Sequence, residues 1–191
     1  MKKIILASTS PRRRELLKIL ALPFEAVKSG YEEDNNMPVT PDELVVALAK
    51  GKASAVASEY NDAIVIGVDT VVSMDGKMYG KPKDRDDAYR MLKEFNNTQH
   101  KVISGYYLID TSNNVEKSGL VQTVIKFKNN SDEELRRYAN SADVLDKAGA
   151  YDLEDKGIVF LENLNGDFYN SIGLPLTAIA EELKELGIEV V

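Results

Sequence analysis

The most strand-like part of the chain is segment 63–74 (AIVIGVDTVVSM), a β-branched and almost continuously apolar run. Such a run is typical of a strand that is buried on both faces. Shorter apolar segments at 3–7, 24–27 and 158–162 predict further strands. These segments indicate a sheet whose central part is covered on both sides.

Segments 102–110 and 115–128 predict two antiparallel strands joined around Asn113-Asn114. In the second segment, apolar residues or threonine alternate with mostly polar residues between positions 121 and 127. This period of two is typical of a strand with one face in the core and one in solvent. The chain therefore combines buried and half-buried strands.

Apolar residues at helical spacing predict helices between these strands. Ser10 followed by Pro11 is a typical helix start, because Ser caps the first turn and Pro suits the first helical position. Ser131 and Glu134 form the pattern of a capping box. One predicted helix begins at residue 11. The other predicted helices cover 41–59, 84–95, 131–139 and 175–186. Helices interleaved with both kinds of strand predict an α/β fold with a mixed sheet.

The length of 191 residues suits one large domain or two lobes that share a core. With no repeat or linker in the pattern, residues 1–191 are expected to form a single domain. No apolar stretch approaches the roughly 18–20 residues of a membrane-spanning helix, and the run after the basic start is too short for a secretory signal. Cysteine is absent, and the single histidine, His100, is interpreted as a structural residue at a strand edge. We expect a soluble cytoplasmic protein with no membrane partner.

The net charge of −7 argues against a nucleic-acid binder, which needs a basic face. Yet residues 1–30 contain seven basic and only two acidic side chains, and three of the basic ones are the arginines 12–14 after Pro11. Cations at a helix N-terminus oppose the helix dipole by roughly 0.3–1 kcal/mol each, whereas an anion is favoured there. The cluster predicts a bound phosphate group. The alternative is a solvated face whose arginines pair with Glu15 or Glu25.

Asp69 interrupts the apolar strand 63–74, where an unpaired carboxylate is expensive to bury. Apolar residues continue beyond it, so we expect Asp69 to pair with a cation or to bind a metal. Thr70 points to the opposite face of a regular strand. Glu33 lies in an acidic loop segment, 32–34. Together with Asp69, this segment offers the hard oxygen ligands that Mg²⁺ or Mn²⁺ prefers.

Three lysines are candidates to extend a phosphate site. Lys50 and Lys52 lie about 200° apart on a helix, so at most one of them faces the same site as Arg12. Lys81 lies between a glycine, which permits close backbone approach, and a proline, which stiffens the chain. Neither lysine segment matches the P-loop motif, and no GxGxxG motif occurs. These residues indicate phosphoryl chemistry without specifying the reaction.

Eight segments of the chain carry a more specific signal. In order they are LASTSPRRRELL (6–17), SGYEED around Glu33, LAKGKASAV (48–56), IGVDTVV (66–72), GKP (80–82), HKVISG (100–105), DKAGAY (146–151) and GLPL (173–176). In these segments the chain resembles the Maf family of nucleoside triphosphate pyrophosphatases over essentially its whole length. The resemblance implies an elongated mixed sheet flanked by helices, with two lobes around a central cleft, and often a homodimer. It also implies hydrolysis of a nucleoside triphosphate to the monophosphate and pyrophosphate with a divalent metal.

The resemblance implies a role for the residues singled out above. Asp69 matches the catalytic carboxylate, which acts as a base toward water or as a metal ligand. Glu33 matches a further acidic, metal-binding position. The residues that match the polyphosphate grip are Ser8, Arg12, Lys52 and Lys81. The expected cofactor is therefore Mg²⁺ or Mn²⁺, and the expected partner is a nucleoside triphosphate.

The positions associated with the choice of base match Arg13, Thr70 and Glu154, and here the chain departs from the pattern. The thymidine and uridine branch has Gln where this chain has Glu154; a glutamine can donate and accept, whereas an ionised glutamate only accepts. A branch acting on 7-methyl-GTP is similar in having Glu there, but it lacks the combination of Arg13 with Asp69-Thr70. We expect dTTP and UTP as substrates, with CTP or a modified nucleotide as alternatives. A nucleotide-sensing regulator of cell division and a phosphatase that releases orthophosphate are the alternative functions.

Overall fold

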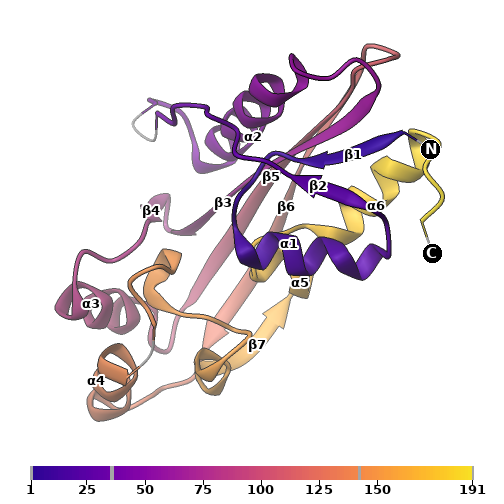
Figure 1. The fold of residues 1–191 in the computed structure, drawn as a ribbon. Coiled ribbons are helices and arrows are strands. Elements are labelled where there is room, and N and C mark those ends of the chain that lie inside the picture. Colours follow the sequence, from indigo (N-terminus) through magenta and orange to yellow (C-terminus); the bar gives the residue numbers. More distant parts are fainter. Residues whose placement is uncertain (1, 35–36, 142, 191) are drawn as a thin grey trace. The chain divides into compact units, whose positions relative to one another are not determined.

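The computed structural model describes residues 2–34, 37–141 and 143–190 (Figure 1). Its strands are β1 (Lys3–Leu6), β2 (Phe24–Ala26), β3 (Ala63–Met74), β4 (Lys77–Tyr79), β5 (Gln99–Asp110), β6 (Val115–Phe127) and β7 (Leu161–Asn165). Its α-helices are α1 (Pro11–Leu17), α2 (Pro41–Ala57), α3 (Arg85–Phe95), α4 (Asp132–Ser141), α5 (Phe168–Ser171) and α6 (Leu176–Glu185). Short 3₁₀-helices cover Lys18–Leu20, Ala148–Ala150 and Lys156–Phe160.

The sheet is mixed and flanked by helices, which confirms the predicted fold class. Its strands follow the order β2-β1-β3-β5-β6-β7, with β4 paired to β3. β1 runs parallel to both β2 and β3, whereas β3 and β4, and likewise β6 and β7, are antiparallel. The register of β1 with β3 ends at the pair Leu6 and Ile66, although β3 continues to Met74. Asp69 therefore lies in the part of β3 that extends beyond its pairing with β1.

The chain divides into two compact units. The first contains residues 1–70, 104–121 and 173–191, and the second contains residues 71–103 and 122–172. The strands β3, β5 and β6 each contribute residues to both units. The expectation that residues 1–191 form one domain stays a prediction.

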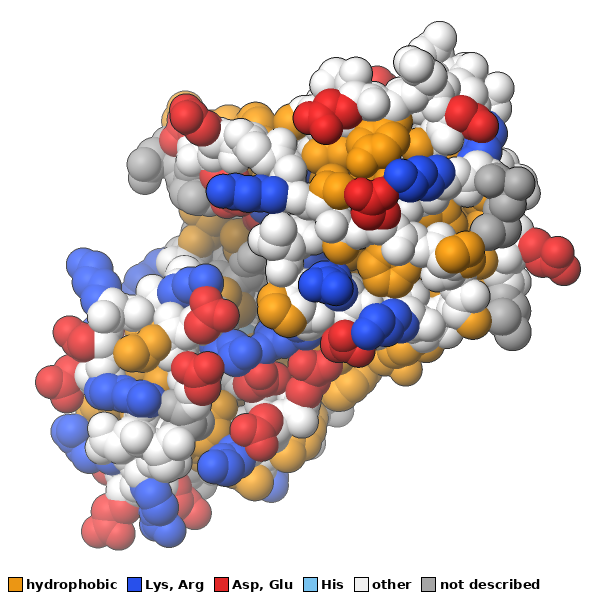
Figure 2. All heavy atoms as spheres, viewed as in Figure 1, with side chains coloured by type: hydrophobic (Ala, Val, Ile, Leu, Met, Phe, Trp, Pro, Cys, Tyr) orange, Lys and Arg blue, Asp and Glu red, His pale blue; other side chains and the backbone are white. Residues whose placement is uncertain are grey.

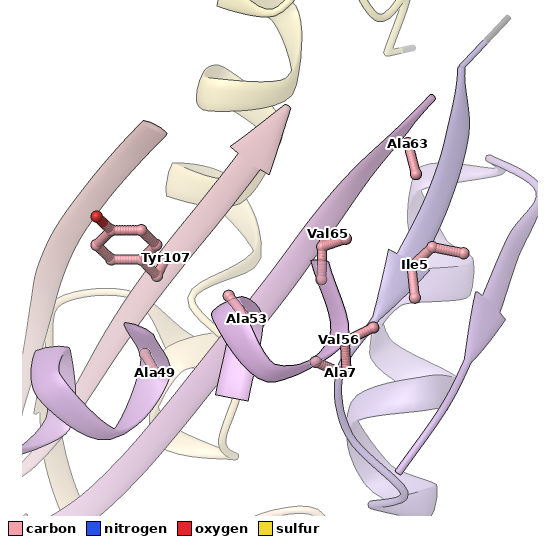
Figure 3. Close-up of a cluster of buried hydrophobic side chains, with 8 residues drawn as sticks. All are labelled: Ile5, Ala7, Ala49, Ala53, Val56, Ala63, Val65 and Tyr107. Atoms are coloured by element: carbon pink, nitrogen blue, oxygen red, sulfur yellow. The ribbon is translucent and has the colours of Figure 1, made fainter. Parts of the chain in front are cut away.

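Small apolar side chains form the core of the first unit between α2 and the sheet (Figure 3). Ala49 and Ala53 of α2 pack with Ile5 of β1 and Val65 of β3. Gly67 explains how closely α2 approaches, because a Cβ at Gly67 would lie only 2.1 Å from the carbonyl oxygen of Ala49. The helix therefore lies directly against the backbone of β3, two residues before Asp69.

The second unit has an aromatic core. Phe95 stacks on His100 with ring centroids 4.2 Å apart, and Phe127 and Tyr151 contact the same imidazole edge to face. His100 is 2% exposed, and its Nε2 shares a hydrogen bond of 2.8 Å with the Tyr151 hydroxyl. His100 thus occupies a structural position, but it lies buried within β5 rather than at a strand edge.

The strand predicted at 158–162 is placed wrongly. Lys156–Phe160 forms a 3₁₀-helix, and β7 follows it. Ile158 and Val159 are 44% and 58% exposed and only Phe160, 2% exposed, is buried, so most of this run lies outside the core. The turn closes because Gly157 lies against the backbone, where a Cβ would come within 2.3 Å of a carbonyl oxygen. A run of four apolar residues without alternation has no period that separates a strand from a helix.

Two short elements were missed by the sequence pattern. The strand β4 is only three residues long and the helix α5 only four. Asp167 is the N-cap of α5, and its Oδ1 accepts hydrogen bonds from the backbone amides of Tyr169 and Asn170. Elements of three or four residues are too short to show a hydrophobic period.

The surface carries charges of both signs. Figure 2 shows Lys and Arg side chains interspersed with Asp and Glu rather than separated from them. Among the described helices, none is long and apolar enough to span a membrane. The acidic excess of the chain is thus largely ordinary surface charge.

Candidate active site

Asp69 is 8% exposed in β3 and pairs with a lysine. The ammonium of Lys52, itself 7% exposed in α2, donates to Asp69 Oδ1 at 2.5 Å. The same Nζ lies 2.9 Å from Oε1 of Glu33, in the loop before α2. Because a buried carboxylate without a partner is expensive, this pairing explains how β3 tolerates Asp69. Of the two candidate lysines in α2, Lys52 faces Asp69, whereas Lys50 lies over the ring of Tyr107.

Tyr31 holds the loop that carries Glu33 against α2. Its ring lies on Gly51, where a Cβ would come within 2.3 Å of a ring carbon. Glu33 follows Tyr31 by two residues and Lys52 follows Gly51 by one, so this contact places the carboxylate beside the ammonium. Glu33 and Lys52 were predicted as site residues from the sequence, but Tyr31 and Gly51, whose contact positions them, were not. The available signal was the aromatic residue next to the acidic segment.

Burial raises the pKa of Asp69 above its ordinary value, because desolvation disfavours the charged carboxylate. The positive charges of Lys52 and Arg13 act in the opposite direction, and the negative charge of Glu33 adds to the rise. A raised pKa makes a carboxylate a stronger proton acceptor. The surroundings of Asp69 therefore suit it to accept a proton from a water molecule.

Arg13 lies in α1 and makes three hydrogen bonds to other segments of the first unit. Its Nη1 donates to the carbonyl oxygen of Val68 at 2.7 Å, and its Nε donates to the carbonyl oxygen of Gly173 at 2.9 Å. Its Nη2 donates to Thr70 Oγ1 at 3.2 Å. The hydroxyl of Thr70 also lies 2.8 Å from that of Ser104, which is fully buried in β5. Arg13 and Thr70 were predicted as site residues from the sequence, whereas Gly173 and Ser104 were not, although they lie in the segments GLPL and HKVISG.

The start of α1 has the capping geometry that the sequence predicted. Ser10 is the N-cap, and its Oγ accepts a hydrogen bond from the Arg13 amide at 3.5 Å. Ser8 lies just before the cap, and its Oγ accepts from the Ser10 amide at 3.2 Å. Arg12 is partly exposed in the first turn. The first unit contains Ser8, Arg12, Arg13, Glu33, Lys52, Asp69 and Thr70, which come from α1, α2, β3 and two loops. Direct contacts join Lys52 to Asp69 and Glu33, and Arg13 to Thr70.

Glu15 and Glu25, the alternative partners of the arginines at positions 12–14, each form an ion pair with a lysine. Glu15 lies 2.7 Å from the ammonium of Lys18, and Glu25 lies 2.6 Å from that of Lys3. Both pairs are exposed, and such pairs contribute little to stability. That the arginines at positions 12–14 bind a phosphate group stays a prediction.

Lys81 and Glu154 belong to the second unit. Lys81 is exposed and forms an ion pair with Asp146 of the DKAGAY segment. The amide of Gly149 in that segment donates to the carbonyl oxygen of Gly80 at 3.1 Å, so the segment is tied to the residue before Lys81. Glu154 is exposed three residues after the segment ends. Binding of the polyphosphate by Lys81 and contact of Glu154 with the base stay predictions.

The residues present suit a hard divalent cation that arrives with its substrate. Within the part of the chain that the structure describes, no group of three or more acidic or histidine side chains is arranged to hold a metal ion. Two carboxylates, those of Glu33 and Asp69, do converge on the ammonium of Lys52. Mg²⁺ is usually held by one or two carboxylates, and water and substrate phosphates complete its shell. The donor set therefore fits Mg²⁺ or Mn²⁺ bound together with a polyphosphate.

The fold and this site define an α/β protein with a buried lysine–carboxylate centre beside an arginine-rich helix start. Residues 3–186 match the family model described as Maf-like protein, and the chain belongs to this family. It is 41% identical over 190 residues to a dTTP/UTP pyrophosphatase of Bacillus cereus (strain G9842), covering 100% of this chain and 98% of the relative. A dTTP/UTP pyrophosphatase of Clostridium novyi (strain NT) is 42% identical over 191 residues, covering 98% of this chain and all of the relative.

Another relative and a solved structure complete the comparison. A dTTP/UTP pyrophosphatase of Pelotomaculum thermopropionicum is 41% identical over 190 residues, with both chains covered completely. The Staphylococcus aureus Ham1 protein shares 13% identity at a TM-score of 0.46, covering 66% of this chain and 72% of that one. The family assignment rests on the sequence relatives.

Proposed function

We propose that this protein is a nucleoside triphosphate pyrophosphatase that hydrolyses dTTP and UTP to the nucleoside monophosphate and pyrophosphate. The observation that carries the proposal is the buried Asp69, paired with Lys52 and joined through it to Glu33, in a family whose full-length relatives are named dTTP/UTP pyrophosphatases. A structural ion pair needs no second carboxylate on the same lysine. A second carboxylate suits a polyphosphate site with a divalent cation, because Mg²⁺ is held by one or two carboxylates together with substrate phosphates.

In this proposal Asp69 acts as a general base. Asp69 takes a proton from a water molecule, whose oxygen attacks the α-phosphorus of the nucleotide. The bond from the α-phosphorus to the bridging oxygen of the β-phosphate breaks, and the electron pair leaves with pyrophosphate. The raised pKa of Asp69 favours the proton transfer, because a more basic carboxylate holds the proton better.

The cationic side chains neutralise the triphosphate. Phosphoryl transfer depends mainly on positioning and charge stabilisation, so Arg12, Lys52 and Lys81 are assigned to the phosphate oxygens, and Ser8 contributes a hydroxyl. Glu33 would hold Mg²⁺ or Mn²⁺, and Asp69 would share the cation with it in the alternative role, in which Asp69 is a metal ligand instead of the base. When bound, such a cation supplies further neutralisation of the charge on the phosphates.

The change Asp69→Asn tests the proposal. The amide keeps the size of the side chain and an oxygen that accepts from Lys52, but it cannot take a proton. We expect turnover to fall roughly 100- to 10,000-fold while nucleotide binding persists. Pyrophosphate release measures turnover, and calorimetric titration with dTTP measures binding. Near-normal turnover in a folded variant would contradict the assignment.

Asp110→Asn is the matched control. Asp110 is also a buried carboxylate in the first unit, 1% exposed and paired with Lys2, but its remaining hydrogen bonds go to the turn residues Ser112 and Asn113. Its loss is expected to reduce stability and to leave turnover close to that of the wild type. An equal loss of turnover in both variants would indicate a general effect of removing a buried charge.

The identity of the products separates the alternative functions. The protein is incubated with dTTP, UTP, CTP, GTP, ATP and 7-methyl-GTP in the presence of Mg²⁺ or Mn²⁺. Monophosphate with pyrophosphate supports the proposal, and orthophosphate indicates a phosphatase instead. Binding without turnover indicates a nucleotide-sensing regulator. Preference for 7-methyl-GTP would show that Glu154 places the chain with the modified-nucleotide branch.

A further inference from the structure

The segment 147–152 of the second unit is closed by an ion pair between its two ends. Lys147 Nζ lies 3.3 Å from Asp152 Oδ2, and the two side chains are only 21% and 14% exposed. The neighbouring pair of Lys81 with Asp146 is, by contrast, exposed. A largely buried ion pair adds little net stability, and its best attested use is to fix one arrangement of the chain. The pair of Lys147 with Asp152 is therefore suited to hold this segment in one conformation.

The backbone between Lys147 and Asp152 has an unusual conformation. Gly149 has a φ of 73°, and Ala150 has a φ of 63° although it carries a side chain. The left-handed region is disfavoured for alanine and persists only where the surroundings impose it. Here the Ala150 amide donates to the carbonyl oxygen of Lys147 at 3.0 Å, which closes a tight turn. The ion pair thus spans a turn that the local sequence alone does not favour.

This turn is tied to the residues that precede and include Lys81. The amide of Gly149 donates to the carbonyl oxygen of Gly80 at 3.1 Å. The carboxylate of Asp146, which precedes Lys147 in the chain, pairs with the Lys81 ammonium. The turn lies beside α3 in the second unit (Figure 1). A change in the turn therefore displaces both a backbone contact and a side-chain contact of the Lys81 segment.

The other oxygen of the Asp152 carboxylate is tied to Glu154. Asp152 Oδ1 accepts a hydrogen bond from the Glu154 amide at 2.9 Å, which is the geometry of an Asx-turn. The backbone of Asp152 is held separately, because its amide donates to the hydroxyl of Tyr138 in α4 at 3.1 Å. The residues on either side of it, Tyr151 and Leu153, are buried. One carboxylate thus contacts the turn with one oxygen and the backbone of Glu154 with the other.

We propose that Asp152, through its ion pair with Lys147, is a positioning residue that holds Lys81 and Glu154 in the arrangement that receives the nucleotide. The inference rests on the proposed function, in which Lys81 binds the polyphosphate and Glu154 contacts the base. Asp152 touches neither the substrate nor the reacting atoms. It acts through the turn 147–150 on Lys81 and through its Oδ1 on Glu154, so phosphate binding and base contact in the second unit depend on the same carboxylate.

The variant Asp152→Asn tests the link to Lys81. Asparagine keeps the size of the side chain and an oxygen that accepts from the Glu154 amide, but it removes the charge that holds Lys147. Because small displacements of a binding group are costly, we expect KM for dTTP to rise on the order of tenfold. The value of kcat should stay within about twofold of the wild type, because Asp69 lies in the first unit and keeps its contacts.

Inorganic tripolyphosphate isolates phosphate binding, because it carries no base. Calorimetric titration in the presence of Mg²⁺ should give a Kd that is about tenfold higher for Asp152→Asn than for the wild type. Tighter binding in this variant would show that the released Lys147 binds the anion directly, and it would overturn the positioning role.

A double-mutant cycle with Lys147→Met shows whether the pair acts as a unit. Removing one partner leaves the other charge buried without compensation, which by itself destabilises the fold. The double variant Lys147→Met/Asp152→Asn contains no such charge and is expected to fold even where a single variant does not. Its KM should be raised about as much as in each single variant, because all three lack the same interaction. Wild-type KM in the double variant would show that only the uncompensated charge matters.

The variant Asp152→Ala tests the link to Glu154. Alanine removes the ion pair and also the acceptor of the Glu154 amide, whereas Asp152→Asn removes the ion pair alone. We therefore expect the ratios of kcat/KM among dTTP, UTP and CTP to change by about fivefold in Asp152→Ala and to stay those of the wild type in Asp152→Asn. Equal ratios in the two variants would show that the bond from Asp152 does not position Glu154.

The ion pair of Lys126 with Glu162 provides the matched control. It joins β6 to β7 in the same unit with a distance of 2.6 Å, and it is remote from the turn in sequence. Lys126→Met and Glu162→Gln make the same changes of charge, and both should leave KM and the substrate ratios within about twofold of the wild type.

Hydrogen exchange gives a readout that does not depend on turnover. In Asp152→Asn and Lys147→Met, amides of peptides covering residues 146–154 should exchange about tenfold faster than in the wild type, because the turn opens more often. Peptides from α2 in the first unit should be unaffected. Unchanged exchange at 146–154 would show that the ion pair does not hold the turn.

The outcomes separate this inference from the proposed function. Wild-type KM in both single variants and in the double variant overturns the positioning role while leaving the pyrophosphatase assignment intact. Absence of pyrophosphate release from the wild type overturns the proposed function. In that case tripolyphosphate binding and hydrogen exchange still decide whether Asp152 and Lys147 hold the turn and the phosphate contact of Lys81.

Discussion

At the scale of single residues, the first unit holds two buried aspartates with different surroundings. Asp110 is satisfied by Lys2 and by the turn that follows it, and its pKa is lowered because these hydrogen bonds outweigh the cost of burial. Asp69 has one lysine that it shares with Glu33, and its pKa is raised because burial dominates. The same residue type thus has a lowered pKa in one place and a raised pKa in the other.

His100 provides a prediction at the same scale. Burial among aromatic rings lowers its pKa to about 3, from the ordinary value of 6.5. Above pH 6.5 the imidazole is neutral in both the folded and the unfolded state and contributes no pH dependence. As the pH falls from 6.5 toward 3, only the unfolded state binds the proton, so the free energy of unfolding should decrease by up to about 1.4 kcal/mol per pH unit.

Urea unfolding of the wild type and of His100→Gln between pH 7 and pH 4.5 measures this effect. Glutamine retains a polar partner for Tyr151 but does not titrate, and carboxylates common to both proteins cancel in the difference. The stability of the wild type relative to the variant should therefore fall below pH 6.5. Parallel curves for the two proteins would show that His100 accepts its proton within the fold. The chain has one histidine, so no other imidazole contributes in this range.

At the scale of elements, glycine sets the distance between α2 and its neighbours. Gly67 lets α2 lie on β3, and Gly51 lets the ring of Tyr31 lie on α2. Both contacts determine where a site residue ends up, Lys52 in the first case and Glu33 in the second. The helix that carries Lys52 is thus positioned by residues with no side chain.

Gly51→Ala is expected to lower turnover without unfolding the protein. Alanine is favoured over glycine inside a helix by up to about 1 kcal/mol, which offsets part of the cost of displacing the Tyr31 ring. The loop should move and take Glu33 away from Lys52, so pyrophosphate release should fall while the thermal midpoint changes little. Ser54→Ala, at an exposed position of the same helix, controls for helix propensity. Equal activity of the two variants would show that the contact between Tyr31 and Gly51 does not position Glu33.

At the scale of the whole molecule, the two compact units share three continuous strands. β3, β5 and β6 each begin in one unit and end in the other. A strand that loses its pairing at one end weakens the pairing along its length. We therefore expect a single cooperative unfolding transition, as for small single domains.

Scanning calorimetry tests this expectation. The calorimetric enthalpy of unfolding should equal the van't Hoff enthalpy, because all of the chain unfolds in one step. Two resolved transitions, or a ratio of the two enthalpies well above one, would show that the units unfold separately and that residues 1–191 are not one domain in the thermodynamic sense.

Much of this architecture follows from local sequence patterns. The strand 63–74 and the helix starts at Pro11, Pro41 and Ser131 were predicted because hydrophobic period and capping chemistry act over a few residues. The run 158–162 was misplaced because it has no period, and its path depends on the close approach of Gly157 to the backbone of Asp152. Asp69 was identified because a carboxylate inside an apolar strand demands a partner.

The sequence therefore determined which residues are chemically unusual: the arginines at a helix start, an acid within a buried strand and the acidic loop before α2. Tertiary structure decided what they contact. Arg13 bonds to carbonyls 55 and 160 residues away, and Lys52 rather than Lys50 reaches Asp69 because Gly67 lets α2 lie on the strand. Local propensity is a property of a few neighbouring residues, whereas hydrogen-bond partners depend on how distant segments pack. Packing of α1 against the sheet decides that Arg13 forms hydrogen bonds with the strand that contains Asp69.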